Sequence, residues 1–167
     1  MTRFEMACNG RWLVFPLAFL ASPVLAQNPA NTQIVAQPPS TDPSDRLAAN
    51  LVVLSQNPND VGALTEAGIS AVAVGDGTAA LSFLSRAEVI SPKDGAIKAA
   101  IGSALLLMEK PGEALKLFAE ASALGLPEHI VARDRGLAHD LRGDQRRAQR
   151  DYALALKHGP DDEVTRR

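Results

Sequence analysis

One period of this chain is the 34-residue stretch PKDGAIKAAIGSALLLMEKPGEALKLFAEASALG, which occupies residues 92–125. Its distinctive residues return at the same interval on both sides. Glycine recurs at positions 68, 102 and 136, and alanine recurs at 80, 114 and 148 and again at 87, 121 and 155. A bulky residue keeps the interval as Leu84, Phe118 and Tyr152. Self-similarity at a fixed period of roughly 20–50 residues is typical of an array of stacked repeats.

A second signature marks the boundaries between periods. Pro58-Asn59-Asp60 and Pro92-Lys93-Asp94 lie one period apart, and Pro160-Asp161-Asp162 follows two periods later. The slot between them holds Leu126-Pro127-Glu128, where the proline is displaced by one residue. Proline ends the preceding helix, and the aspartate can cap the next one by accepting its free backbone N–H groups. Each period therefore predicts two amphipathic helices: 61–74 and 78–91, then 95–108 and 112–124, then 129–141 and 145–158.

The repeating small residues have a physical reason. A glycine in the first helix of each pair lets the second helix approach closely, and alanines in the second helix accept that approach. We expect the bulky residue to lie between successive helix pairs and fill the space there. The chain is 46% apolar and only 4% aromatic, which favours closely packed helices over a β-sandwich. The sequence thus predicts an all-α protein.

The first 26 residues have the pattern of a secretory signal peptide. Arg3 and Arg11 precede an apolar stretch from Trp12 to Ala21, and Val24-Leu25-Ala26 offers small residues for cleavage before Gln27. The predicted location is therefore the bacterial periplasm, with membrane contact only through this segment. An uncleaved segment that anchors the chain in the inner membrane is the alternative. The lone cysteine, Cys8, would leave with the signal peptide, which excludes disulfides and thiolate chemistry from the processed chain.

Two further segments precede the repeats. Residues 27–43 are polar, contain four prolines and show no helical period, so we expect a disordered linker. Residues 44–57 are expected to form a leading helix, with Leu47, Leu51 and Leu54 on one apolar stripe and Ser44 as its N-cap.

These registers resemble those of the tetratricopeptide-repeat (TPR) family, over three units at residues 58–162. The resemblance implies a right-handed helical-hairpin solenoid that binds proteins and has no catalytic role. The large aromatic residue that the family usually has early in its first helix is Leu64, Lys98 and Ala132 here. Residues 133–152 are similar to exported TPR proteins of tight-adherence pilus assembly (TadD-like). They are also similar to TPR segments that precede peptidoglycan-binding SPOR domains. Both an adaptor in pilus or secretion-system assembly and a peptidoglycan-associated envelope protein therefore stay open.

The resemblance also implies where a partner would bind. In a TPR array the concave surface is lined mainly by the first helix of each pair. We expect a partner peptide or helix to lie there, with Arg133 contacting an acidic group. The alternative is that the apolar positions merely seal the stack. The expected groove residues are Thr65, Ile69, Val72, Ala99, Ser103, Leu106, Ile130, Arg133, Leu137 and Asp140.

A cluster of arginines stands near the third turn. It comprises Arg142, Arg146, Arg147 and Arg150, and Asp140, Asp144 and Asp151 are interleaved with them. The interleaving favours a solvated face whose charges compensate one another. An anionic partner or lipid headgroup is the alternative.

Several kinds of chemistry find no support in the sequence. His129, His139 and His158 have no metal-binding spacing, so we expect no metal site, and no cofactor motif is present. The net charge of −2 argues against nucleic-acid binding. Residues 163–167 read as the start of a further, truncated helix. Because repeat arrays usually need a polar terminal cap, we expect self-association through an uncapped C-terminal end as one possibility.

Overall fold

The computed structural model describes residues 42–158, and within that range it contains seven α-helices and no strand. The all-α prediction is therefore confirmed. The predicted signal peptide, almost all of the linker, and residues 159–167 lie outside the described residues. The helices are α1 (Pro43–Gln56), α2 (Val61–Ala73), α3 (Gly77–Ile90), α4 (Gly95–Leu107), α5 (Pro111–Ala123), α6 (Glu128–Leu141) and α7 (Gln145–His158).

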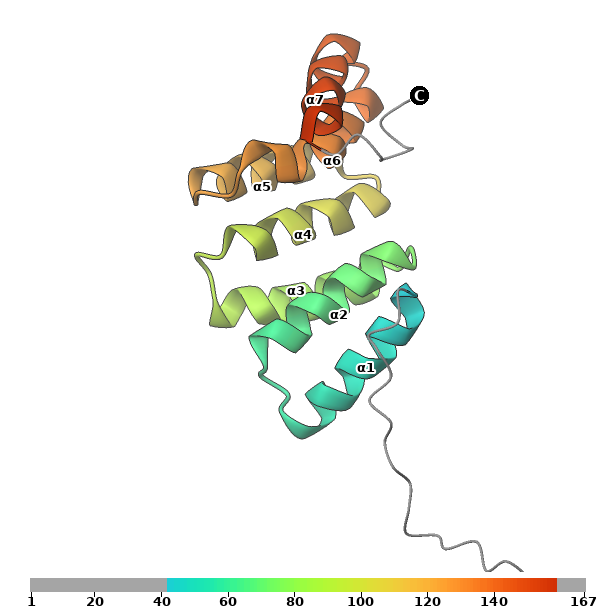
Figure 1. The fold of residues 1–167 in the computed structure, drawn as a ribbon, viewed down its shortest axis with the longest axis vertical. Helices are drawn as coiled ribbons and strands as arrows, with labels where there is room; N and C mark the ends of the chain where they lie inside the picture. Colours follow the sequence, from blue (N-terminus) through green and yellow to red (C-terminus); the bar gives the residue numbers. More distant parts are fainter. Residues whose placement is uncertain (1–41, 159–167) are drawn as a thin grey trace, which may run out of the picture. The chain divides into compact units, whose positions relative to one another are not determined.

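Six of these helices form three antiparallel hairpins, which stack in sequence order (Figure 1). The hairpins are α2–α3, α4–α5 and α6–α7, and each hairpin contacts the next through α3 against α4 and α5 against α6. The first helices also meet one another, α2 against α4 and α4 against α6. The predicted helix pairs are thus observed, with boundaries that differ by one residue at most ends. The stack places α2, α4 and α6 along one side.

The leading helix begins one residue earlier than predicted, and its N-cap is not Ser44. Asp42 caps α1, because its Oδ1 accepts a hydrogen bond from the Ser44 backbone N–H at 2.8 Å. Pro43 at the first helical position has no N–H to satisfy, so it favours this start. Of the predicted apolar stripe, Leu54 is buried against α2 while Leu51 is 45% exposed.

Helix α1 occupies the register of a second helix, since it lies one period before α3. The positions that hold buried Ala80 and Leu84 in α3 hold Arg46 and Asn50 in α1. The Asn50 side-chain amide donates to the Arg46 carbonyl oxygen at 2.8 Å. No first helix precedes α1 within the described residues, and Arg46 and Asn50 are half-buried at the positions that such a helix would cover.

Aspartates cap five of the seven described helices, including α1. Asp60 and Asp94 cap α2 and α4 as predicted, each accepting backbone N–H groups of the first turn. Asp76 and Asp144 do the same inside the first and third hairpins, at α3 and α7. The other two starts have no side-chain cap: Lys110 precedes α5 and Pro127 precedes α6. The displaced proline therefore coincides with the loss of a capping carboxylate.

The repeating glycine packs against the repeating bulky residue of its own hairpin. A Cβ atom added at Gly102 would lie 2.5 Å from Cε1 of Phe118, and the same clash pairs Gly136 with Tyr152 at 2.7 Å. Gly68 has the same relation to Leu84. The prediction placed the bulky residue between successive hairpins and did not include this contact. Glycine is required because the ring or isobutyl group fills the volume that a side chain would need.

Candidate binding groove

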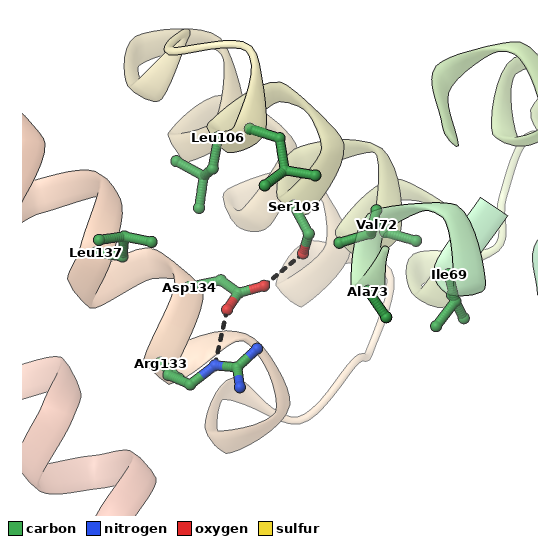
Figure 2. Close-up of a pocket in the computed structure, with 10 residues that line it drawn as sticks. Ile69, Val72, Ala73, Ser103, Leu106, Arg133, Asp134 and Leu137 are labelled. Carbon is green, nitrogen blue, oxygen red and sulfur yellow. Dashed lines mark hydrogen bonds and ion pairs between the residues drawn. The ribbon is translucent and has the colours of Figure 1, made fainter. Parts of the chain in front are cut away.

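An open groove of about 530 Å³ runs across the first helices of the three hairpins (Figure 2). Each of α2, α4 and α6 contributes to it, so the groove exists only because three repeats stack in register. We call this surface the A-helix groove. Its lining consists of Ile69, Val72 and Ala73 from α2, Ala100, Ser103, Leu106 and Leu107 from α4, and Arg133, Asp134 and Leu137 from α6.

The wall of the A-helix groove is mainly apolar and partly open to solvent. Ile69, Leu107 and Leu137 are 37%, 45% and 40% exposed, one large side chain from each helix. Leu106 is only 7% exposed and belongs to the core as well as to the wall. Large apolar side chains left accessible in a concave surface are the usual lining of a ligand or peptide site. Their burial by a partner would release apolar surface from water.

One edge of the groove is polar. The Ser103 hydroxyl donates to Oδ2 of Asp134, which links α4 to α6, and Nε of Arg133 donates to Oδ1 of the same carboxylate at 3.0 Å (Figure 2). Asp134 thus receives a donor on each oxygen. The Arg133 side chain is about half exposed. The groove therefore presents an apolar floor with an ordered, oriented guanidinium at its rim.

Six of the ten predicted groove residues line this surface: Ile69, Val72, Ser103, Leu106, Arg133 and Leu137. The other four do not. Thr65 donates its hydroxyl to the Val61 carbonyl at 2.8 Å, and Ala99 packs against the core. Asp140 lies in the last turn of α6 and accepts from the Gln145 side chain at 2.6 Å. Ile130, 58% exposed in the first turn of α6, lies outside the lining.

Sequence reasoning missed four lining residues: Ala73, Ala100, Leu107 and Asp134. Each one is the chain neighbour of a predicted position. The prediction used one fixed set of positions for every repeat, whereas the lining is displaced around the helix by one residue in places. Asp134 could have been found from its place one turn before Leu137 on the same helix face.

The arginine cluster is compensated only in part, since Asp144 pairs with Arg147 at 3.4 Å but Asp151 does not face the cluster. Asp151 is 5% exposed and faces the interior of the third hairpin, so it cannot neutralise the surface. Its carboxylate receives two hydrogen bonds from Arg135, Nε to Oδ2 at 2.9 Å and Nη2 to Oδ1 at 2.7 Å. Hydrogen bonding to Asp151 raises the pKa of the Arg135 guanidinium, although partial burial acts against it. Asp151 is instead half of a buried ion pair.

The structure brings two of the histidines together. The rings of His129 and His158 stack with centroids 4.5 Å apart, between the first turn of α6 and the last turn of α7. His139 does pack between helices, with Nε2 3.9 Å from Oδ2 of Asp151. Among residues 42–158, no group of three His, Cys, Asp or Glu side chains is placed to hold a metal ion. The described helices also include none with the length and apolar character needed to cross a bilayer.

Helix α7, the last of the described helices, exposes little apolar surface. Leu154 and Leu156 of α7 are half-buried, and the large apolar side chains exposed in the described chain all belong to earlier helices and turns. The self-association predicted for this end stays a prediction.

Comparison with known proteins identifies the fold. No family model matches the chain, and no curated protein shows significant sequence similarity to it. Solved structures do match. The crystal structure of MamA superposes with a TM-score of 0.57 at 23% identity, over 71% of this chain and 70% of that one. MamA 41-end from Desulfovibrio magneticus RS-1 gives 0.59 at 19% identity, over 72% and 70%.

A third similar structure carries the name of the repeat. TTC0263, a thermophilic TPR protein in Thermus thermophilus, superposes with a TM-score of 0.58 at 21% identity, over 74% of this chain and 69% of that one. The chain therefore has the fold of a TPR-type helical array.

Proposed function

We propose that this chain is a protein-binding scaffold without catalytic activity, and that the A-helix groove holds an apolar segment of a partner protein. One observation carries the proposal: three successive first helices each leave a large apolar side chain accessible in the same groove. Ile69, Leu107 and Leu137 would otherwise cost free energy by exposure to water. An amphipathic helix or an extended segment would cover all three at once.

The polar rim adds direction to the proposed contact. Nε of Arg133 donates a hydrogen bond to Asp134, and about half of the Arg133 side chain is accessible. A partner segment with a carboxylate beside its apolar side chains would match this rim, since guanidinium and carboxylate groups pair well. The groove would then bind both an apolar side chain and an acidic group of the partner.

Site-specific photocross-linking tests the groove. The full chain is expressed in its host with a photoreactive residue in place of Leu107 or Leu137, and in place of Val89 as a control. Val89 is 83% exposed on α3 and outside the groove. The proposal expects a discrete cross-linked protein from both groove positions and none from Val89. Cross-links of equal yield at all three positions, or none in the groove, would contradict it.

Charge substitution measures the same site once the cross-linked partner is identified. Leu107→Asp and Leu137→Asp are expected to weaken partner binding at least tenfold, while Val89→Asp leaves it unchanged. These positions are better probes than Leu106, whose burial means that Leu106→Asp would damage folding. Thermal unfolding of each variant shows that the loss does not come from an unfolded array.

The finer proposal is an adaptor in pilus or secretion-system assembly in the bacterial periplasm. It rests on the signal-peptide pattern of residues 1–26 and on the resemblance of residues 133–152 to tight-adherence TPR proteins. Cell fractionation with N-terminal sequencing tests the location: the exported form should start at Gln27. A full-length chain in the inner membrane would support the anchored alternative. The genes immediately downstream distinguish the assembly adaptor from the peptidoglycan-associated envelope protein.

A further inference from the structure

A basic surface covers the outer side of α7, opposite to the side that packs on α6. Arg146, Arg150 and Lys157 are all exposed and lie within a narrow sector of the helix, because their spacings of four and seven residues bring them to one face. Arg147 is exposed at its border. We call these four residues the α7 basic face. The buried Ala148 and Asp151 lie on the opposite side of the helix.

The repeat itself shows that this charge is not imposed by the fold. The positions of Arg146 and Arg150 are filled by Thr78 and Ser82 in α3, which are also exposed. In α5 the position of Arg150 is filled by Lys116. The same outer register is therefore neutral in the first hairpin and carries one cation in the second.

Among the described residues, acidic neighbours pair with only one of the four cations of the α7 basic face. Asp151, the only carboxylate within α7, is buried against Arg135. Asp144 pairs with Arg147 at 3.4 Å, and Asp140 accepts from Gln145. Within the described part of the chain, Arg146, Arg150 and Lys157 form no ion pair with a carboxylate. A face of this kind attracts an anionic group.

The cations are also placed against the local electrostatics of the helix. Arg146 and Arg147 stand in the first turn of α7, which holds no acidic residue. The positive end of the helix macrodipole disfavours cations there. Arg146 makes no compensating ion pair within residues 42–158, so its charge does not serve the stability of α7. A destabilising surface charge of this kind is typical of a functional position.

The kind of anion follows from the rest of the molecule. Residues 42–123 hold 10 Asp or Glu against 6 Lys or Arg, a balance of −4, while residues 124–158 hold 5 against 7, a balance of +2. A membrane surface or a nucleic acid extends beyond one helix face and would be repelled by the acidic hairpins. A short acidic segment would meet only the α7 basic face.

The predominance of arginine also favours a carboxylate-bearing partner. Three of the four cations are arginine, whose planar guanidinium binds a carboxylate through two parallel hydrogen bonds. Arg146 and Arg150 are about 6 Å apart along the helix axis, from the rise per residue. Carboxylates four residues apart on a partner helix have the same spacing. We propose that the α7 basic face docks a short acidic helix of a partner protein, at a second site separate from the A-helix groove.

Titration of the full chain with a defined probe tests this inference. The probe is a capped, alanine-based helical peptide of about 18 residues with glutamates four apart, compared with the same peptide carrying glutamine. At ~50 mM salt we expect the glutamate peptide to bind at least tenfold more tightly than the glutamine peptide. The difference should shrink at ~500 mM salt. Backbone amide chemical-shift changes should centre on α7.

Three variants sharpen the test. Arg146→Glu/Arg150→Glu should abolish the preference for the glutamate peptide, and Arg146→Lys/Arg150→Lys should retain part of it, since charge stays but bidentate geometry goes. The control Lys93→Glu/Lys116→Glu makes the same charge change on the second repeat, and it should bind the peptide as the unaltered chain does. Because Arg146 opposes the helix dipole, the double glutamate variant should melt at the same temperature or about 1–5 °C higher.

The remaining outcomes overturn the inference. Equal binding of both peptides, or equal loss in the control variant, means that the face has no preference for an acidic helix. Tighter binding to vesicles rich in phosphatidylglycerol, or to a DNA duplex, than to the glutamate peptide identifies the wrong class of partner. Self-association that the double glutamate variant abolishes assigns the face to a second copy of this chain. A melting temperature lowered by the glutamate substitutions assigns the arginines a structural role. None of these outcomes bears on the groove.

Discussion

The first two hairpins and the third are built on the same backbone with different chemistry inside. In the second hairpin, the positions between the helices are filled by Ile101 and Leu117, both packed in the apolar core. In the third, the same positions hold Arg135 and Asp151, joined by two hydrogen bonds. The repeat therefore tolerates either an apolar contact or a closed ion pair. What it cannot tolerate is one half of the pair without the other.

The largest expected effect comes from breaking that pair. Arg135→Ala leaves the Asp151 carboxylate buried without its donor, and we expect a loss of about 3 kcal/mol in the free energy of unfolding. Arg135→Ile/Asp151→Leu copies the second hairpin and is expected to be neutral or stabilising by up to ~4 kcal/mol. Urea unfolding of the single and double variants measures both. A double variant as unstable as the single one would show that an apolar contact cannot replace the ion pair in the third hairpin.

Gly→Ala substitutions are expected to lower the free energy of unfolding by different amounts in the second and third hairpins, and by less than the loss of the ion pair. Gly102→Ala forces a methyl group against Phe118, which is fully buried and cannot move aside, so we expect a net loss of about 1–2 kcal/mol. Gly136→Ala meets Tyr152, which is only half-buried and can swing outward, so the loss should stay under about 1 kcal/mol. Thermal unfolding of the two variants compares them. Equal losses would mean that Tyr152 is held as firmly as Phe118.

A substitution in the turn of the second hairpin is expected to raise, not lower, the free energy of unfolding. Gly75 and Gly143 have φ values of 86° and 78°, and the second hairpin places Glu109 in the same register at 58°. A side chain is strained there, so Glu109→Gly should stabilise the array by about 1 kcal/mol. Gly143→Ala, the converse change in the third hairpin, should destabilise it by a similar amount. A decrease in the melting temperature of Glu109→Gly would show that this side chain has a compensating contact.

The smallest effect concerns Lys98, which fills the slot of Leu64 and Ala132. Its Nζ lies 2.8 Å from Glu88 and 3.0 Å from Glu120, and hydrogen bonds to Glu88 and then Glu120 raise the pKa of the ammonium. A raised folded-state pKa means that the contribution is complete below the unfolded value of about 10.4 and is lost as pH rises through the folded-state pKa. Because Glu120 is half exposed, solvent screening limits the contribution to about 0.5 kcal/mol.

A paired measurement isolates this contribution. The free energy of unfolding of the unaltered chain and of Lys98→Met is measured at pH 9 and at a pH above the folded-state pKa of Lys98. Between the two pH values, the unaltered chain is expected to lose about 0.5 kcal/mol relative to the variant. Lys93→Met serves as the control, since Lys93 is exposed and forms no ion pair among residues 42–158. A pH-independent difference would assign Lys98 a packing role alone.

How far the sequence predicts this molecule depends on which residues interact. The helix boundaries and the caps at Asp60 and Asp94 follow from neighbours within one turn, and those predictions hold. The place of α1 one period before α3 could also have been found, but Arg46 and Asn50 replace the small and bulky residues that mark the register. Six of the ten predicted groove positions line the pocket, because a fixed repeat position does not specify which side chain faces the groove in each repeat.

The sequence by itself determined the period, the helix pairs and the small residues at which the helices meet. These depend on local hydrogen bonds and on a pattern that the chain repeats. Only the tertiary structure decided that Asp151 faces inward to Arg135, and that Asp134 joins Ser103 at the groove. Those partners lie 16 and 31 residues apart. Whether a carboxylate is a solvated charge or half of a buried pair depends on the side chains that packing brings to it, and sequence spacing alone does not specify them.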